Sequence, residues 1–183
     1  MSKRLQRLTP NHLEKRQQII DAAIRVFTRD GVSSCSARAI AREGDFNNGL
    51  IHYYFESVDQ IIDAAAEQMA QGIMEEIRAV TERHAEPVEQ FWAVIEQHLA
   101  AFENPKGRTL MWLDYLVLSV RGERNRAIAH IDDVIIDALS QALAAAGVPL
   151  PRVRARVICS YVLGAAVRRE IKPQTRKSLR EEI

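Results

Sequence analysis

Apolar residues recur along almost the whole chain at the spacing of an amphipathic helix, about 3.6 residues. No stretch alternates apolar and polar residues as a half-buried strand does. The pattern therefore predicts an all-α fold. The predicted helices cover about 12–29, a short segment around 37–41, then 47–55, 57–79, 87–102, 109–120, 128–146 and 152–170.

Residues suited to caps and turns separate these segments. Asp30-Gly31 is expected to end the first helix, and Ser33, Ser34 or Ser36 to cap the second. Gly44-Asp45 suits a tight turn, and Asn47 a helix N-cap. Ser57 and Gln60 have the spacing of a capping box at the start of the long helix.

The apolar stripes also predict which residues face inward. In the helix over 57–79 these are Ile61, Ile62, Ala65, Met69, Ile73 and Ile77. In the last helix they are Val157, Ile158, Tyr161, Val162 and Ala165.

Two short helices joined by a tight turn and braced by a preceding helix are typical of a helix-turn-helix. In the second of them, Ile51, Tyr54 and Phe55 can face a core. The opposite side then carries small or polar residues, which suits a helix that enters a DNA groove: Asn48, Gly49, His52 and Tyr53. An ordinary helical hairpin has the same geometry and remains an alternative.

The segment from Ile19 to Ile62, about a quarter of the chain, resembles the DNA-binding domain of tetracycline-repressor (TetR) type regulators. The matching features are Ala22-Ala23, Phe27, Gly31, Arg38-Ala39-Ile40-Ala41, Gly49 and Tyr53-Tyr54-Phe55. Three positions depart from the family pattern. Gly44-Asp45-Phe46 stands where the family favours Ala-Gly-Val, Leu50 replaces a hydroxyl residue, and Val58 replaces a lysine.

The resemblance implies that Arg38 contacts phosphate or guanine and that Asn48 contacts bases, where an amide suits adenine. Asn47 would cap the helix, Gly49 would let the backbone approach DNA, and Leu50 could meet a thymine methyl group. The remaining expected DNA contacts come from Ser36, His52, Tyr53, Tyr54 and Ser57, chiefly to phosphate.

The distribution of charge along the chain also indicates a basic N-terminal arm. The net charge is +1, but residues 1–16 hold Lys3, Arg4, Arg7, Lys15 and Arg16 against Glu14 alone. We expect Lys15 and Arg16 to contact phosphate, although a solvated tail would have the same composition. Residues 61–151 are acidic, with 7 basic and 14 acidic side chains, which argues against a nonspecific nucleic-acid coat.

Other classes of function find little support. No apolar run reaches the length of a membrane span, so a cytoplasmic protein without a membrane partner is expected. Cys35 and Cys159 are far apart and fit isolated core thiols better than a metal site. The histidines lack the spacing of a metal or catalytic site, and no glycine loop for phosphate occurs. We therefore expect no cofactor, no metal and no enzymatic activity.

The middle of the chain is rich in aromatic residues, which at helical spacing often form only a core. The family resemblance implies an inducer pocket in this region. The candidate residues for its lining are Trp92, His98, Phe102, Met111, Trp112, Asp114 and Tyr115. Asp114 favours the pocket because a carboxylate in an apolar helix needs a partner. Alternatively, it faces solvent or pairs with Arg108 or Arg121.

Together these patterns predict a DNA-binding domain over 1–56, with its basic arm, and an effector-binding and dimerisation domain over 57–183. We expect a homodimeric regulator, a repressor that binds an inverted-repeat operator in double-stranded DNA and is released by a small-molecule effector. The helices over 128–146 and 152–167 would form a four-helix interface between subunits. The alternative is a helical small-molecule- or partner-binding protein with a vestigial helix-turn-helix.

Overall fold

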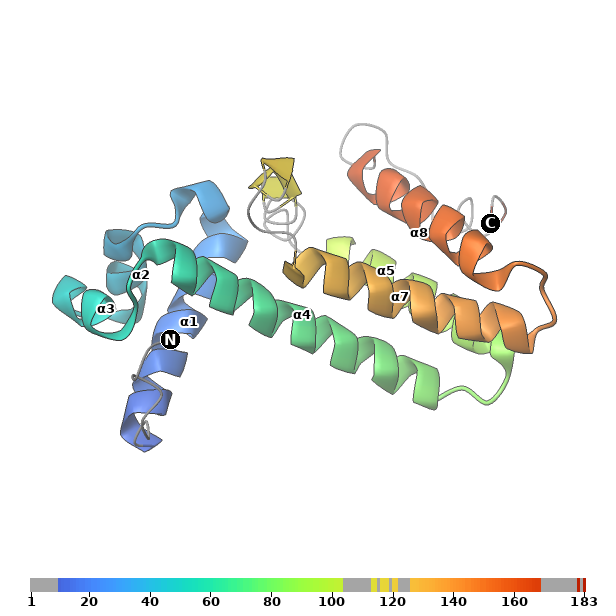
Figure 1. Cartoon of the computed structure of the whole chain (residues 1–183), viewed down its shortest axis with the longest axis horizontal. Coiled ribbons are helices and arrows are strands. Elements are labelled where there is room, and N and C mark those ends of the chain that lie inside the picture. The colour runs from blue at the N-terminus through green and yellow to red at the C-terminus, as the bar shows by residue number, and fades with distance from the viewer. Residues whose placement is uncertain are drawn as a thin grey trace, which may run out of the picture. The chain divides into compact units, whose positions relative to one another are not determined.

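The structure is a computed structural model that describes residues 10–103, 113, 114, 116–118, 120, 121, 126–168, 181 and 183; at 101–103 and 126–128 the description covers the backbone alone. Within these residues every regular element is a helix (Figure 1). The predicted all-α fold is confirmed. None of the helices in this part of the chain is long and apolar enough to cross a membrane.

The helices lie close to the predicted ranges. They are α1 Pro10–Asp30, the 3₁₀ turn η1 Val32–Ser34, α2 Ala37–Gly44, α3 Asn48–Tyr54, α4 Val58–Glu82, α5 Pro87–Glu103, α7 Arg126–Ala145 and α8 Pro151–Arg168. The predicted helix over 109–120 lies partly outside the described residues, and 113, 114, 116–118 and 120 are helical.

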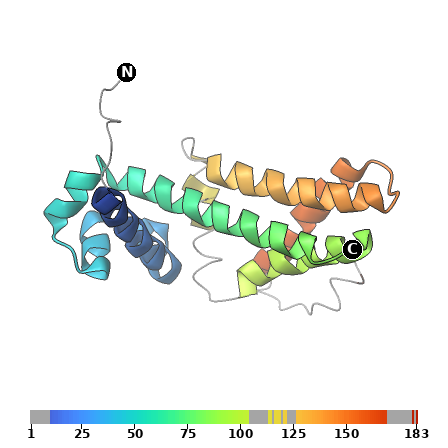
Figure 2. The same ribbon diagram turned by 90° about the horizontal axis from the view of Figure 1, so that it is seen from below.

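The chain divides into two compact units, Met1–Met69 with Leu110–Arg124 and Ala70–Thr109 with Asn125–Ile183. The helix α4 is uninterrupted and runs from the first unit into the second (Figure 1 and Figure 2). The predicted division between residues 56 and 57 concerns function, and it stays a prediction.

The core of the first unit forms around one face of α1. Phe27 and Ile19 are fully or almost fully buried, because the spacing of apolar residues brings them to the same side of the helix. The other helices contribute buried side chains to this core: Ile40 and Ala41 from α2, Ile51 from α3, Phe55 after it, and Ile61, Ile62 and Ala65 from α4. The inward positions Ile51 and Phe55, predicted for the second helix of the helix-turn-helix, are thus confirmed, whereas Tyr54 is half-buried.

Farther along α4, the predictions for two core residues were wrong. Met69 and Ile73 are half-buried, whereas Ala70 is fully buried. The buried side of α4 changes where the helix leaves the first unit. A single apolar stripe along the whole helix therefore does not predict the buried residues there.

In the second unit α5, α7 and α8 pack together through small and branched side chains. The buried residues of α8 are Ala155, Cys159, Val162, Ala165 and Ala166. The Cys159 thiol donates a hydrogen bond to Asp132 Oδ1 of α7 at 3.5 Å. The prediction for Val157 is wrong, since its side chain is 65% exposed, and Ile158 and Tyr161 are half-buried. Alanine and cysteine allow α8 to lie close to its neighbours, so this face is the one it buries.

Candidate nucleic-acid interface

Local hydrogen bonds fix the ends of α2 and α3. Ser36 Oγ accepts a hydrogen bond from Ala39 N at 3.2 Å, and Asn47 Oδ1 accepts one from Gly49 N at 2.8 Å. Asn47 is therefore the N-cap that the sequence predicted, and Ser36 is the cap among the three candidate serines. Ser33 and Ser34 lie in η1 instead.

The turn between α2 and α3 uses a left-handed residue and a close aromatic contact. Asp45 has φ 54° and ψ 47°, a conformation that aspartate tolerates better than most residues. The Phe46 ring lies over Gly44, and a Cβ at residue 44 would overlap that ring. Gly44 and Phe46 are both departures from the TetR-type pattern. Because of this contact, the two departures depend on one another.

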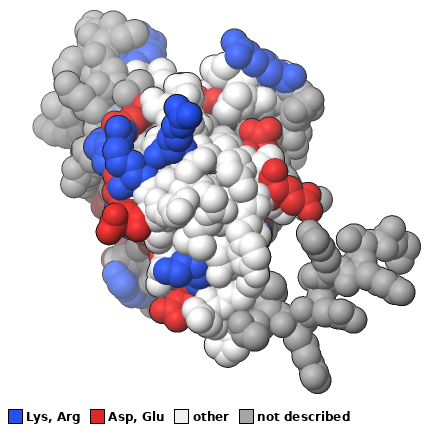
Figure 3. All heavy atoms as spheres, turned by 90° about the vertical axis from the view of Figure 1, so that its left-hand side faces the viewer, with Lys and Arg blue, Asp and Glu red and all other residues white. Residues whose placement is uncertain are grey.

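The outer face of α3 carries uncharged polar groups. Asn48, Gly49 and His52 are exposed, and Tyr53 is 72% exposed. Uncharged groups fill much of the face in Figure 3, which is the α2–α3 end of Figure 1, and both basic and acidic side chains lie around them. An uncharged, hydrogen-bonding helix face suits contact with base edges in a DNA groove.

The other predicted DNA contacts vary in exposure. Ser36, Arg38 and Ser57 are exposed, whereas Leu50 and Tyr54 are half-buried. The structure thus places the predicted residues from Ser36 to Ser57 in one unit, on α2, on α3 and at the start of α4.

Lys15 and Arg16 both contact protein groups. Arg16 Nη1 donates a hydrogen bond to the Tyr54 carbonyl oxygen at 3.0 Å, and its guanidinium carbon lies 4.1 Å from the centre of the Phe55 ring. Burial lowers the pKa of Arg16. Lys15 Nζ donates to Gln18 Oε1 at 2.7 Å and lies 5.5 Å from the centre of the Phe46 ring.

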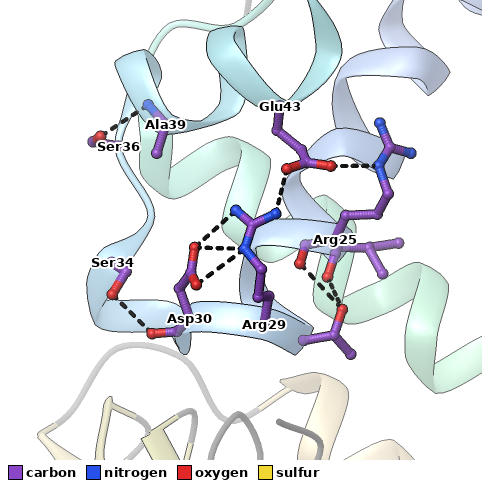
Figure 4. Close-up of polar contacts among 9 residues, drawn as sticks. Arg25, Arg29, Asp30, Ser34, Ser36, Ala39 and Glu43 are labelled. Carbon is purple, nitrogen blue, oxygen red and sulfur yellow. Dashed lines mark hydrogen bonds and ion pairs between the residues drawn. The ribbon is translucent and has the colours of Figure 1, made fainter.

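An ion-pair network holds α2 against α1 (Figure 4). Glu43 accepts from Arg25 Nε at 2.9 Å and from Arg29 Nη1 at 2.6 Å, and Arg29 also pairs with Asp30 at 2.8 Å. Hydrogen bonds from Arg29 hold the pKa of Glu43 and of Asp30 below their usual values. Arg25 and Arg29, beside the helix-turn-helix, therefore pair with carboxylates of the protein itself.

The start of α4 has a variant of the predicted capping box. Ser57 Oγ accepts from Gln60 N at 3.2 Å, whereas Gln60 Oε1 accepts from Glu56 N at 3.0 Å, one residue before the cap. Farther along, the Gln68 amide donates to Asp21 Oδ1 at 3.1 Å, and Gln17 donates to Gln68 Oε1 at 2.6 Å. These hydrogen bonds join α4 to α1.

The predicted effector residues are only partly within the described structure. Met111, Trp112, Tyr115 and the Phe102 side chain lie outside it. Trp92 is half-buried on α5, with its ring 5.1 Å from that of Phe91. Burial lowers the pKa of His98 to about 4.

Asp114 contacts the loop that follows α1. Its Oδ2 accepts a hydrogen bond from Val32 N at 3.1 Å. Gly31, at φ 81°, leaves space for this carboxylate, because a Cβ at residue 31 would lie 2.6 Å from Oδ2. In this contact the partner of Asp114 is a backbone amide, and not an arginine side chain as the sequence suggested.

A cavity of about 560 Å³ lies within the second unit, between the latter part of α4 and α7. It shares no residue with the predicted effector set. Its lining residues are Gln71, Met74, Glu75, Ile77, Arg78, Thr81, Glu82, Val134, Asp137, Ala138 and Gln141. Three carboxylates and one guanidinium make this lining acidic. In the described part of the chain, no group of His, Cys, Asp and Glu is arranged to hold a metal ion.

Comparison with known proteins relates this arrangement to a family. Residues 19–65 match the family model described as bacterial regulatory proteins, tetR family. The nicotine-responsive transcriptional repressor HdnoR of Paenarthrobacter nicotinovorans is 37% identical over 91 residues, which cover 44% of this chain and 45% of that protein. The transcriptional regulator BetI of Brucella anthropi is 26% identical over 117 residues, or 64% and 60% of the two chains.

These matches span about half the length of the curated relatives. A solved structure, that of a transcriptional regulator from Saccharomonospora viridis in complex with choline, superposes with a TM-score of 0.81. Its sequence is 17% identical, and the match covers 93% of each chain. At this identity the likeness concerns the fold.

Proposed function

Because the chain belongs to the tetR family of bacterial regulatory proteins, we propose that it is a DNA-binding transcriptional regulator that acts as a homodimer. One observation carries the proposal. The outer face of α3 presents Asn48, His52 and Tyr53 to solvent, while Ile51 fixes the helix on the core from the other side. These are the properties of a helix that enters the major groove. The proposal assigns no catalytic role to the chain.

In this proposal, each subunit places α3 in one major groove of an inverted repeat. Arg38 and Asn48 contact base edges, and Ser36, Tyr53 and the N-terminal amides of α4 at Ser57 contact phosphates. The half-sites lie about one helical turn apart, ~34–36 Å. The regulator acts as a repressor, and binding of an effector in the second unit releases it from the DNA.

Selection of bound duplexes from random DNA tests this function. We expect enrichment of an inverted repeat, and binding that weakens steeply as salt is raised. Recovery of no preferred sequence from the full chain would contradict the proposal and favour the alternative of a ligand-binding protein with a vestigial helix-turn-helix.

We propose that the effector is a small organic cation. The relatives include a nicotine-responsive repressor and a protein solved with choline, and both compounds carry a basic or quaternary nitrogen. The acidic lining of the cavity between α4 and α7, with Met74 and Ile77 as apolar groups, suits such a ligand.

Titration with choline and with nicotine, followed by calorimetry, distinguishes the two candidate effector sites. Glu75→Gln is expected to weaken the response if the cavity between α4 and α7 is the site. His98→Gln is expected to do so if the predicted residues of α5, Trp92 and His98, form the site. Wild-type titrations without any response would exclude both compounds as effectors.

A further inference from the structure

The recognition helix α3 lies between two phenylalanines, and each is met by a basic residue of α1. Phe46 precedes the helix and has Lys15 Nζ 5.5 Å from its ring centre. Phe55 follows the helix and has the Arg16 guanidinium carbon 4.1 Å from its ring centre. Two adjacent residues of α1 thus contact both ends of α3.

Arg16 makes the closer contact and adds a hydrogen bond at the C-terminal end of α3. The helix has 7 residues, so most of its backbone groups lie near one end or the other. Asn47 caps the N-terminal end. At the other end the Tyr54 carbonyl oxygen accepts a hydrogen bond from Arg16 Nη1 at 3.0 Å. A cation at this end also interacts favourably with the helix dipole.

A chain of ring contacts continues from this point to the exposed face. The ring of Tyr54 lies 4.5 Å from that of His12, which places it against α1. The ring of Tyr53 meets that of Tyr54 edge to face, at 5.0 Å and 80°. Because Tyr53 is 72% exposed, its direction depends on Tyr54, on the His12 ring 6.2 Å away, and on the backbone of the last turn.

We propose that Arg16 is a positioning residue for DNA binding, which holds the last turn of α3 and thereby orients Tyr53, instead of contacting phosphate itself. This role replaces the phosphate contact expected from the sequence. Lys15 braces the other end of α3 through Phe46. The inference rests on the proposed function, since the orientation of Tyr53 matters only if α3 binds DNA.

The first test needs no DNA. Amide hydrogen exchange is compared in the wild type, Arg16→Gln and Arg16→Lys. We expect the amides of the last turn of α3 to exchange roughly tenfold faster in Arg16→Gln, the loss of about one charge-assisted hydrogen bond, and those of α2 to remain unchanged. Arg16→Lys is expected to restore little of the protection, because an ammonium lacks the planar face that stacks on Phe55.

Arg38→Gln is the matched control, because its guanidinium is exposed on α2. It is expected to leave the exchange of α3 unchanged. Unchanged exchange in both Arg16 variants would overturn the proposal. If Arg16→Gln does not fold, Arg16→Lys decides the outcome alone.

The second test uses the duplex recovered by selection, at a temperature where every variant is folded. Arg16→Gln should lower affinity roughly tenfold without changing the slope of log K against log salt. A residue that contacts phosphate would instead lower that slope by about 0.9. A fall of this size in Arg16→Gln, or unchanged affinity, would overturn the positioning role.

A double-mutant cycle then tests the path through Tyr53. If Arg16 acts by orienting Tyr53, Arg16→Gln should cost little further affinity in a Tyr53→Ala background. Additive losses would contradict the proposal. If the wild type binds no duplex, the proposed function fails, and the exchange experiment still decides whether Arg16 holds α3.

Discussion

Among single residues, Arg38 and Asn48 are the side chains from which we expect sequence-specific contacts, because both are exposed on the helix-turn-helix. Arg38→Ala and Asn48→Ala should each cost ~1–3 kcal/mol of operator binding and relax the preference at a defined base pair. Binding to a library of single-base operator variants measures both effects. If Asn48→Ala and His52→Ala both left affinity and base preference intact, α3 would not be the DNA-contacting helix.

Glu43 gives a prediction about pH. Its hydrogen bonds from Arg29 and Arg25 lower its pKa in the folded protein. The network therefore stabilises the fold above the unfolded-state pKa of glutamate, about 4.3, and this stabilisation is lost as pH falls through the lower folded value. Glu43→Gln should make stability less dependent on pH between about pH 5 and pH 3.

Urea unfolding of Glu43→Gln and of the wild type at several pH values measures this difference. The control is Glu82→Gln, because Glu82 forms an exposed ion pair with Arg78 at 3.9 Å and should contribute little at any pH. Parallel pH curves for wild type and Glu43→Gln would show that the network does not stabilise the fold.

The residues found from the sequence were those whose roles are local. Asn47 and Ser57 cap the helices that begin beside them, and cap preferences follow from contacts within a few residues. The partners of Arg16 lie 38 and 39 positions away in the chain, so composition gave only its charge and the phosphate contact that charge implies. Its half-buried place against Phe55 appears only in the folded unit.

At the scale of elements, the turn between α2 and α3 offers a test of matched substitutions. Gly44→Ala should destabilise the fold by about 1–3 kcal/mol, because the new Cβ overlaps the Phe46 ring. Phe46→Val in the same chain should recover much of this loss, since the smaller side chain leaves room for the methyl group. Chemical unfolding of the two single variants and the double variant measures the coupling. Additive effects would show that the two positions are independent.

Helix existence was predicted well, whereas the buried side of a helix was predicted unevenly. In α1 the apolar residues lie mainly on one side and face one core, so the period identifies most of the buried residues, although Ile24 is half-buried. In α8 apolar residues occur on more than one side, including Val153 at 55% and Val157 at 65% exposure. Periodicity alone cannot choose between such faces, and small residues such as Ala155 and Cys159 form the buried one.

For the whole molecule, the exposed face of α8 locates the subunit contact that we propose. Val157→Arg should shift the homodimer towards monomer while leaving helix content unchanged, because Val157 is exposed in the single chain. Ala165→Arg should instead disrupt folding, since Ala165 is 7% exposed within one subunit. Sedimentation and circular dichroism separate the two outcomes. A Val157→Arg protein that remains dimeric would place the interface elsewhere.

The two sheltered thiols make the protein suited to site-directed labelling. Burial raises the pKa of both Cys35 and Cys159 to about 12. At pH 8 few of these thiols would be ionised, and the thiolate is the form that attacks maleimides and disulfide reagents. A cysteine introduced at an exposed site outside α7 and α8, such as Val88, should therefore react first in the otherwise unmodified chain. Rapid modification of the native wild type by a disulfide reagent would show that these thiols are accessible.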